Sequence, residues 1–143
     1  IGRMQDVVVV GARSSELENY LEQAAQSQGR YIKSEPTPER GYYYRSDHFN
    51  FAKVGIPALY AESGEDHIEF GLEYGASQAQ DYTDNRYHAA SDEYDPDWDL
   101  SGAAEDISLY FNIVNTLAQE TNYPAWFEGN EFKAIRDSTA SQR

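Results

Sequence analysis

The chain has 143 residues, the length of one ordinary domain with a single hydrophobic core. Its 25 acidic residues outnumber its 11 basic ones and give a net charge of −14, which argues against binding to nucleic acid or to an anionic membrane surface. The sequence has no apolar run near the roughly 18 to 20 residues of a membrane span. It also lacks cysteine, so any metal ion must be held by His, Asp or Glu.

The first predicted elements are a strand, a helix and a second strand. Residues 7–10 are four consecutive valines, which is typical of a strand buried on both faces of a parallel sheet. Apolar residues at helical spacing follow over residues 17–25, and Ser15 with Glu18 matches a capping box at the start of that helix. Residues 31–33 are then predicted as a short strand.

The second half is predicted to hold a short helix, a strand, a long loop and a final helix. Residues 49–54 fit the short helix, and residues 56–61 form an apolar run of strand length that tolerates Pro57 near its start. Residues 62–98 have little periodicity, which predicts a long loop that is either functional or disordered. The final helix covers residues 101–121, with one apolar stripe that we expect to be buried: Ala103, Ile107, Tyr110, Phe111, Val114, Leu117 and Ala118.

Strands that alternate with helices predict an α/β fold. We expect a three-layer α/β/α sandwich in which residues 7–10 and 56–61 are interior strands of one mostly parallel sheet. Residues 1–137 are expected to form one unit, because no internal repeat or domain boundary is visible. The tail at residues 138–143 has nothing to bury and is expected to be disordered.

The three histidines are the nitrogen ligands that this sequence offers to a transition metal. His88 stands in a polar loop without apolar periodicity, so from chemistry alone it is either a metal ligand or a surface or hydrogen-bonded histidine. Asp47 precedes His48 just before the short helix, where an aspartate is equally well placed as an N-cap. His67 has acidic neighbours and is expected to be solvated.

Two sequence blocks, taken in order, favour a metal site over the surface and capping roles of these residues. They are Arg45-Ser46-Asp47-His48-Phe49, which continues to Gly55-Ile56-Pro57-Ala58-Leu59, and Tyr87-His88-Ala89-Ala90-Ser91-Asp92. Together they resemble the C-terminal region of the dizinc exopeptidase family, which includes bacterial aminopeptidases, glutamate carboxypeptidase and zinc-dependent glutaminyl cyclases. The resemblance runs over nearly the whole chain and implies that residues 1–137 are the C-terminal portion of a zinc exopeptidase catalytic domain.

This resemblance implies a zinc-dependent aminopeptidase that hydrolyses N-terminal residues from peptides with a metal-activated water. It implies that His88 binds zinc and that Tyr87 donates a hydrogen bond to the oxyanion. Asp47 would support the metal centre through hydrogen bonds, and His48 would form part of the pocket wall. Two zinc ions are expected, with the remaining ligands and the general base upstream of Ile1, so this chain alone is expected to be inactive.

Two other functions stay open at this point. One is a glutaminyl-cyclase-like acyl transfer on the same scaffold, and the other is a non-catalytic protein-binding domain. An acidic surface suits a peptide substrate with a free α-amino group. Exposed strand edges predict self-association, and the family resemblance favours an extracytoplasmic location.

Overall fold

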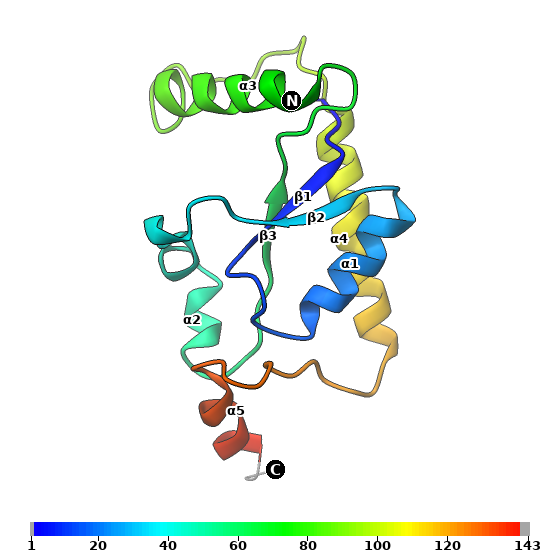
Figure 1. Cartoon of the computed structure of the whole chain (residues 1–143), viewed down its shortest axis with the longest axis vertical. Coiled ribbons are helices and arrows are strands. Elements are labelled where there is room, and N and C mark those ends of the chain that lie inside the picture. Colours follow the sequence, from blue (N-terminus) through cyan, green and yellow to red (C-terminus); the bar gives the residue numbers. More distant parts are fainter. Residues whose placement is uncertain (1, 141–143) are drawn as a thin grey trace.

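The computed structural model describes residues 2–140, and its centre is a three-stranded sheet (Figure 1). The strands are β1 (Asp6–Val10), β2 (Tyr31–Ser34) and β3 (Tyr60–Ser63), in the order β2-β1-β3. The strand predicted at residues 7–10 is confirmed as the central one, and all five residues of β1 are buried. The chain therefore has α/β content around one small sheet.

The sheet is mixed rather than mostly parallel. β1 pairs with β2 in parallel and with β3 antiparallel. In the two ladders Val9 lies opposite Ser34, the last residue of β2, and Val10 lies opposite Tyr60, the first residue of β3. β3 thus starts at the end of the sheet where β2 finishes, and the connection between them passes β1 at that end before β3 runs back antiparallel to it.

The strand predicted at residues 56–61 begins later than expected and lies at an edge of the sheet. The N–H of Ile56 is used locally, because it donates to the carbonyl of Phe51 at 3.1 Å, and Pro57 has no N–H to donate. Pairing with β1 therefore starts only at Tyr60. The expectation of an interior strand here was wrong for the described residues.

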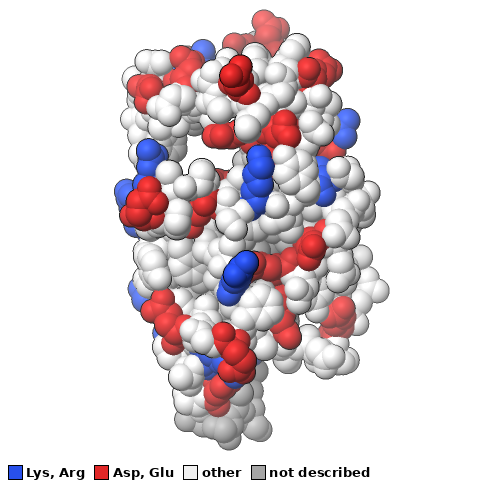
Figure 2. Space-filling model, viewed as in Figure 1, with Lys and Arg blue, Asp and Glu red and all other residues white. Residues whose placement is uncertain are grey.

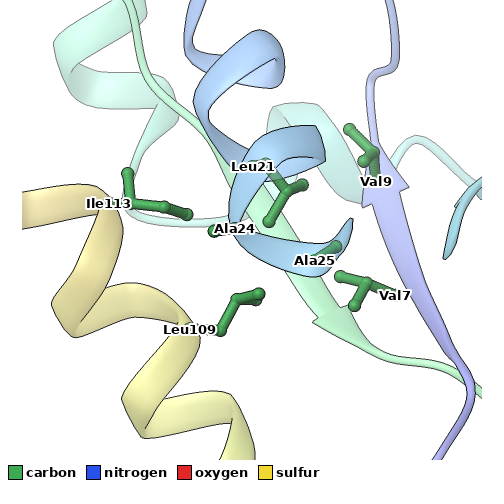
Figure 3. Packing of buried hydrophobic residues seen from close by; sticks show 7 residues of the cluster. All are labelled: Val7, Val9, Leu21, Ala24, Ala25, Leu109 and Ile113. Carbon is green, nitrogen blue, oxygen red and sulfur yellow. The ribbon is translucent and has the colours of Figure 1, made fainter. Parts of the chain in front are cut away.

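Helices α1 (Leu17–Ser27) and α4 (Ser101–Gln119) pack together on one face of the sheet (Figure 1). The capping box is formed in part: the Glu18 carboxylate accepts the backbone N–H of Ser14 at 2.5 Å, but the N-cap is Glu16 rather than Ser15. β1, α1 and α4 together form the core shown in Figure 3, made of Val7, Val9, Leu21, Ala24, Ala25, Leu109 and Ile113.

α4 presents a different face to the core than the sequence predicted. Leu109 and Ile113 are buried, whereas Ile107, Phe111 and Val114 of the expected stripe are 69%, 67% and 64% exposed. Two ion pairs of 2.6 Å, Arg30 with Asp106 and Arg3 with Glu105, hold the first turns of the helix against the body. Positions 106, 109 and 113 share one helical face, so the Asp106 ion pair favours burial of Leu109 and Ile113 and leaves most of the predicted stripe outside, although Leu117 still packs against the core.

The opposite face of the sheet carries a second apolar cluster, made of Val10, Tyr43, Ala52, Trp126 and Phe132. Its residues come from β1, from the short helices η2 (Tyr42–Arg45) and α2 (Phe49–Ala52), and from the C-terminal segment. Another short helix, η1 (Pro38–Arg40), precedes η2. The Trp126 indole N–H donates to the carbonyl of Gly55 at 2.9 Å and ties the C-terminal segment to this layer.

The chain ends in helix α5 (Lys133–Ala140), at the bottom of Figure 1. Residues 138–140 of the tail expected to be disordered continue this helix, and residues 141–143 lie outside the described residues. Among the described helices, none is both long and apolar enough to cross a membrane.

Helix α3 (Gly71–Asn85) lies across the top of Figure 1, within the segment predicted as a long loop. Nearly all its residues are exposed, and Gly75 is its one buried residue. A Cβ atom on Gly75 would lie 1.9 Å from the carbonyl oxygen of Glu65, so the glycine permits the close contact that seats the helix. Without a core-facing stripe, α3 has little of the periodicity by which a helix is predicted.

Candidate functional site

The first sequence block forms the turn that leads into α2. His48 is the N-cap residue of this helix, and Asp47 is exposed beside it. The backbone carbonyl of Asp47 accepts the N–H of Asn50 at 3.1 Å, while its carboxylate has no hydrogen bond within the described part of the chain. The interpretation of Asp47 as a helix cap was therefore wrong, and its carboxylate is free to act elsewhere.

His48 is half-buried between two tyrosines. The centroid of its ring lies 4.6 Å from that of Tyr43 and 5.2 Å from that of Tyr60. Its Nε2 atom is buried without a hydrogen-bond partner among residues 2–140. Burial lowers the pKa of His48, so the imidazole is neutral at neutral pH.

The second block follows α3 directly, and its two predicted site residues lie against each other. The rings of Tyr87 and His88 are stacked with their centroids 4.0 Å apart, and both side chains are exposed. His88 has a left-handed backbone, with φ at 59°. The turn is tied to α3 because the Tyr87 N–H donates to the carbonyl of Tyr82 at 2.9 Å and the Tyr82 hydroxyl donates to Asp92 at 3.0 Å.

Tyr60, the first residue of β3, lies against the first block, because the centroid of its ring is 5.2 Å from that of His48. Burial is the main reason that the pKa of Tyr60 is raised, and Glu62 and Tyr87 raise it further against the opposite effect of Ser46. The convergence of Asp47 with His88 in one cleft stays a prediction.

Two glutamates, neither singled out by sequence reasoning, lie on the same face of the sheet as Tyr60. Glu62 follows Tyr60 by two positions in β3, so the two side chains share a face. Glu35 follows β2; its Oε1 accepts the N–H of Gly11 at 3.0 Å, and its Oε2 is buried without a partner in the described chain. Most of the Glu62 residue is exposed, but its carboxyl group is partly buried. This burial is the main reason that the pKa of Glu62 is raised, and the negative charge of Glu35 raises it further.

His67 is buried, so the prediction that it is solvated was wrong. It is 7% exposed, and its Nδ1 accepts the backbone N–H groups of Glu69 at 3.1 Å and Phe70 at 3.2 Å. Its ring lies 4.9 Å from Phe70 and 5.2 Å from Tyr74. His67 therefore shapes the turn that starts α3. Its acidic sequence neighbours gave no sign of this packing.

Among the residues that the structure describes, no group of three or more His, Cys, Asp and Glu side chains is placed to hold a metal ion. The described residues therefore do not fit a complete zinc site.

An open groove of about 790 Å³ lies elsewhere on the molecule, beside the C-terminal end of α4. Its lining is Leu17, Ile56, Pro57, Val114, Leu117, Ala118, Glu120, Thr121, Asn122, Tyr123, Pro124 and Arg136. It includes no residue of the candidate site, so its volume gives no support to the assignment of that site.

The model of peptidase family M28 matches residues 2–112. This range is most of the chain and includes both sequence blocks, together with Tyr60 and the two glutamates. No curated protein and no solved structure matches the chain.

Proposed function

The chain belongs to peptidase family M28, a family of metallopeptidases, and on that premise we propose that it serves a zinc-dependent aminopeptidase. The reaction is hydrolysis of the N-terminal residue from a peptide. The observation that carries the proposal is the stacked and exposed pair of Tyr87 and His88, which lies inside the matched range and in the sequence block that resembles the zinc-ligand loop of the dizinc exopeptidases.

The residues of this chain have distinct roles in the proposal. Tyr87 presents a phenol that donates a hydrogen bond where negative charge develops on the peptide carbonyl. His88 is assigned to zinc, and further ligands must come from outside the described residues, because these do not form a complete site. Asp47 contributes its free carboxylate through hydrogen bonds, and the neutral ring of His48 forms a wall.

The negative charge of the chain supports the proposal that the substrate has a free α-amino group. The net charge of the chain is −14, and Figure 2 shows acidic side chains spread from top to bottom of the visible face. Such a surface attracts an ammonium group and repels a free carboxylate. The proposal therefore favours an aminopeptidase over a carboxypeptidase. No observation favours a glutaminyl cyclase, since Trp126 is buried in the apolar cluster rather than free to line a pocket.

The proposal also covers the intact domain, the self-association of the chain and its location. We infer a three-layer α/β/α sandwich for the intact catalytic domain, supported by the apolar face of α4 that stays exposed here. The same face, with the edge strand β3, supports self-association of the isolated chain. An extracytoplasmic location is proposed on the family resemblance alone.

The first prediction concerns activity and metal content. The 143-residue chain alone should neither retain zinc through dialysis nor release nitroaniline from an aminoacyl-nitroanilide, because one imidazole binds zinc weakly. The protein expressed with whatever sequence precedes Ile1 in its gene should do both. In that protein, His88→Ala should reduce the zinc content, and Tyr87→Phe should lower kcat by about 100-fold to 1,000-fold without loss of zinc.

Two controls make this test decisive. An N-acetylated substrate reports whether the free amino group is needed, and a peptide with N-terminal glutamine reports cyclisation in place of hydrolysis. Turnover by the 143-residue chain alone, or full activity of the His88→Ala protein, would show that the site is assigned wrongly.

A further inference from the structure

We propose that Tyr82 is a positioning residue that fixes the turn carrying Tyr87 and His88, a role that deepens the proposed peptidase function and rests on it. Tyr82 belongs to neither sequence block and lies in the last turn of α3. The site turn, residues 86–92, follows directly. Tyr82 contacts the start, the middle and the end of this turn through three different groups, its carbonyl, its ring and its hydroxyl.

The backbone of Tyr82 holds the start of the site turn. Its carbonyl accepts the N–H groups of Arg86 and Tyr87, both at 2.9 Å. The bond from Arg86 continues the hydrogen-bond ladder of α3. The bond from Tyr87 spans one residue more and is of the kind that closes the C-terminal ends of helices. The backbone of the proposed oxyanion donor is therefore bonded directly to Tyr82.

The hydroxyl of Tyr82 holds the end of the site turn. It donates to the Asp92 carboxylate at 3.0 Å, and this bond is the main reason that the pKa of the Tyr82 phenol is raised. Inside the turn, the N–H of Ala89 donates to the Arg86 carbonyl at 2.8 Å and the N–H of Asp92 donates to the Ala89 carbonyl at 3.1 Å. The bond between Tyr82 and Asp92 thus returns the last residue of this bonded series to the helix from which it started.

The ring of Tyr82 lies beside the two proposed site residues. Its centroid is 6.0 Å from that of Tyr87, whose ring in turn stacks on His88 at 4.0 Å. His88 has a φ of 59°, a left-handed conformation that residues other than glycine keep where the surrounding contacts fix the backbone. The contacts of Tyr82 on both sides of His88, at Tyr87 and at Asp92, supply that constraint.

Hydrogen bonds rather than packing determine the shape of the site turn. Every one of its residues is exposed, and the chain passes through it between α3 and α4 (Figure 1). The Ser91 hydroxyl adds a bond to the Asn85 carbonyl at 2.9 Å, which leaves Tyr82 as the residue whose side chain reaches Asp92. Removal of this one hydroxyl should therefore loosen the turn without any loss of buried area.

The consequence for catalysis is geometric. An oxyanion donor acts from a defined position, and a misplacement of about 1 Å costs up to about 100-fold in rate. Tyr87 and His88 share one short turn, so a single hydroxyl at its closing point limits the movement of both. Loosening should lower kcat more than it changes KM, because the donor stabilises charge that develops during the reaction.

The test is a double-mutant cycle in the zinc-loaded protein expressed with the sequence that precedes Ile1 in its gene. Tyr82→Phe, which keeps the ring, should lower kcat about 10-fold, with KM changed less than about twofold and Tm changed by less than about 2 °C. Asp92→Ala removes the acceptor and should cause a similar loss. The double variant should lose no more than either single one, because both changes break the same bond. Asp92→Asn keeps an acceptor oxygen and should retain most of the activity.

The matched control is Tyr31→Phe. It removes a hydroxyl that donates to the Asp66 carboxylate at 2.7 Å, from a tyrosine that is 44% exposed where Tyr82 is 38% exposed. Tyr31 belongs to β2 and to neither sequence block. The control should therefore keep the wild-type kcat.

A second readout, NMR of the His88 ring, does not depend on activity. An aromatic ring stacked at 4.0 Å shifts the resonances of its neighbour, so a displaced Tyr87 changes the His88 ring-proton shifts. In the zinc-free protein with labelled histidine, these resonances, assigned by their loss in His88→Ala, should move in Tyr82→Phe and stay in place in Tyr31→Phe.

Four results would overturn the inference: wild-type kcat in Tyr82→Phe, losses that multiply to about 100-fold in the double variant, unchanged His88 resonances, or a fall in Tm well beyond that of Tyr31→Phe, which would indicate a purely structural role. If the intact wild-type protein has no peptidase activity, the proposed function fails. In that case the His88 resonances alone decide whether Tyr82 fixes the turn.

Discussion

At the scale of single residues, His48 is the side chain whose environment has the clearest effect on stability. Its ring is enclosed by Tyr43 and Tyr60, and burial lowers its pKa in the folded chain. An unfolded chain takes up a proton at this position near the ordinary histidine pKa of about 6.5. His48 therefore contributes stability in full above about pH 6.5 and loses it as the pH falls toward the lowered pKa of the folded state.

A second prediction follows from this pH dependence. His48→Phe keeps an aromatic ring but removes the titration, so its Tm should fall less than that of the wild type between pH 7.5 and pH 5.0. Differential scanning calorimetry at both pH values measures the difference. At pH 7.5 the two proteins should have similar Tm values, since both rings are neutral there. Parallel pH profiles would contradict the assignment of a buried neutral imidazole.

The sequence was informative about some site residues and silent about others. Tyr87 and His88 were recognisable because they are adjacent and belong to a family block. Tyr60 belongs to an apolar run that was interpreted as an ordinary strand, Glu62 begins the segment that was interpreted as a loop, and Glu35 follows another strand. The pairing of β2 and β3 on either side of β1 places these residues on one face, and a register between distant segments is not visible in local pattern.

At the scale of elements, α4 shows why periodicity identifies a helix more easily than its buried face. Both of its sides carry apolar residues at helical spacing, so the pattern predicts the helix and leaves its rotation open. The ion pair of Arg30 with Asp106 favours the observed rotation, and it joins residues that are 76 positions apart. The strands at β1 and β2 were easier to predict because their signals are local.

The two sides of α4 lead to a third prediction. Leu109→Ala should cost about 3 kcal/mol in the free energy of unfolding, because Leu109 is 1% exposed and a cavity would remain. Phe111→Ala, on the exposed side of the same helix, should change it by less than about 0.5 kcal/mol. Urea unfolding followed by circular dichroism compares the two variants. A larger loss for Phe111→Ala would mean that this side is covered in solution.

At the scale of the whole molecule, the packing is uneven. β1 is buried along its full length and is paired on both edges, whereas α3 is exposed along nearly all of its length. Its buried contacts are those of Gly75 and of the rings around His67. A segment with so few buried contacts opens at low free energy, independently of the core. The turn with Tyr87 and His88 belongs to this loosely held part.

A fourth prediction is that α3 and β1 differ in the rate at which their backbone amides exchange hydrogen. Amides of α3 should exchange with deuterium within seconds to minutes, while those of β1 should exchange only through global unfolding. Mass spectrometry of peptic peptides resolves the two segments, and peptides from α1 serve as the reference for a helix that packs on the core. Protection of α3 equal to that of α1 would show that its outer surface is covered in solution.

The part of the chain that the family model matches and the part that packs into the two apolar clusters do not end at the same residue. The family match ends at residue 112, in the middle of α4, whereas the second apolar cluster depends on Trp126 and Phe132. The Trp126 bond to Gly55 crosses that border. A chain cut after residue 112 would lose Ile113 from the first cluster and two aromatic rings from the second. The segment beyond the family match thus supplies side chains that complete both apolar clusters of the matched part.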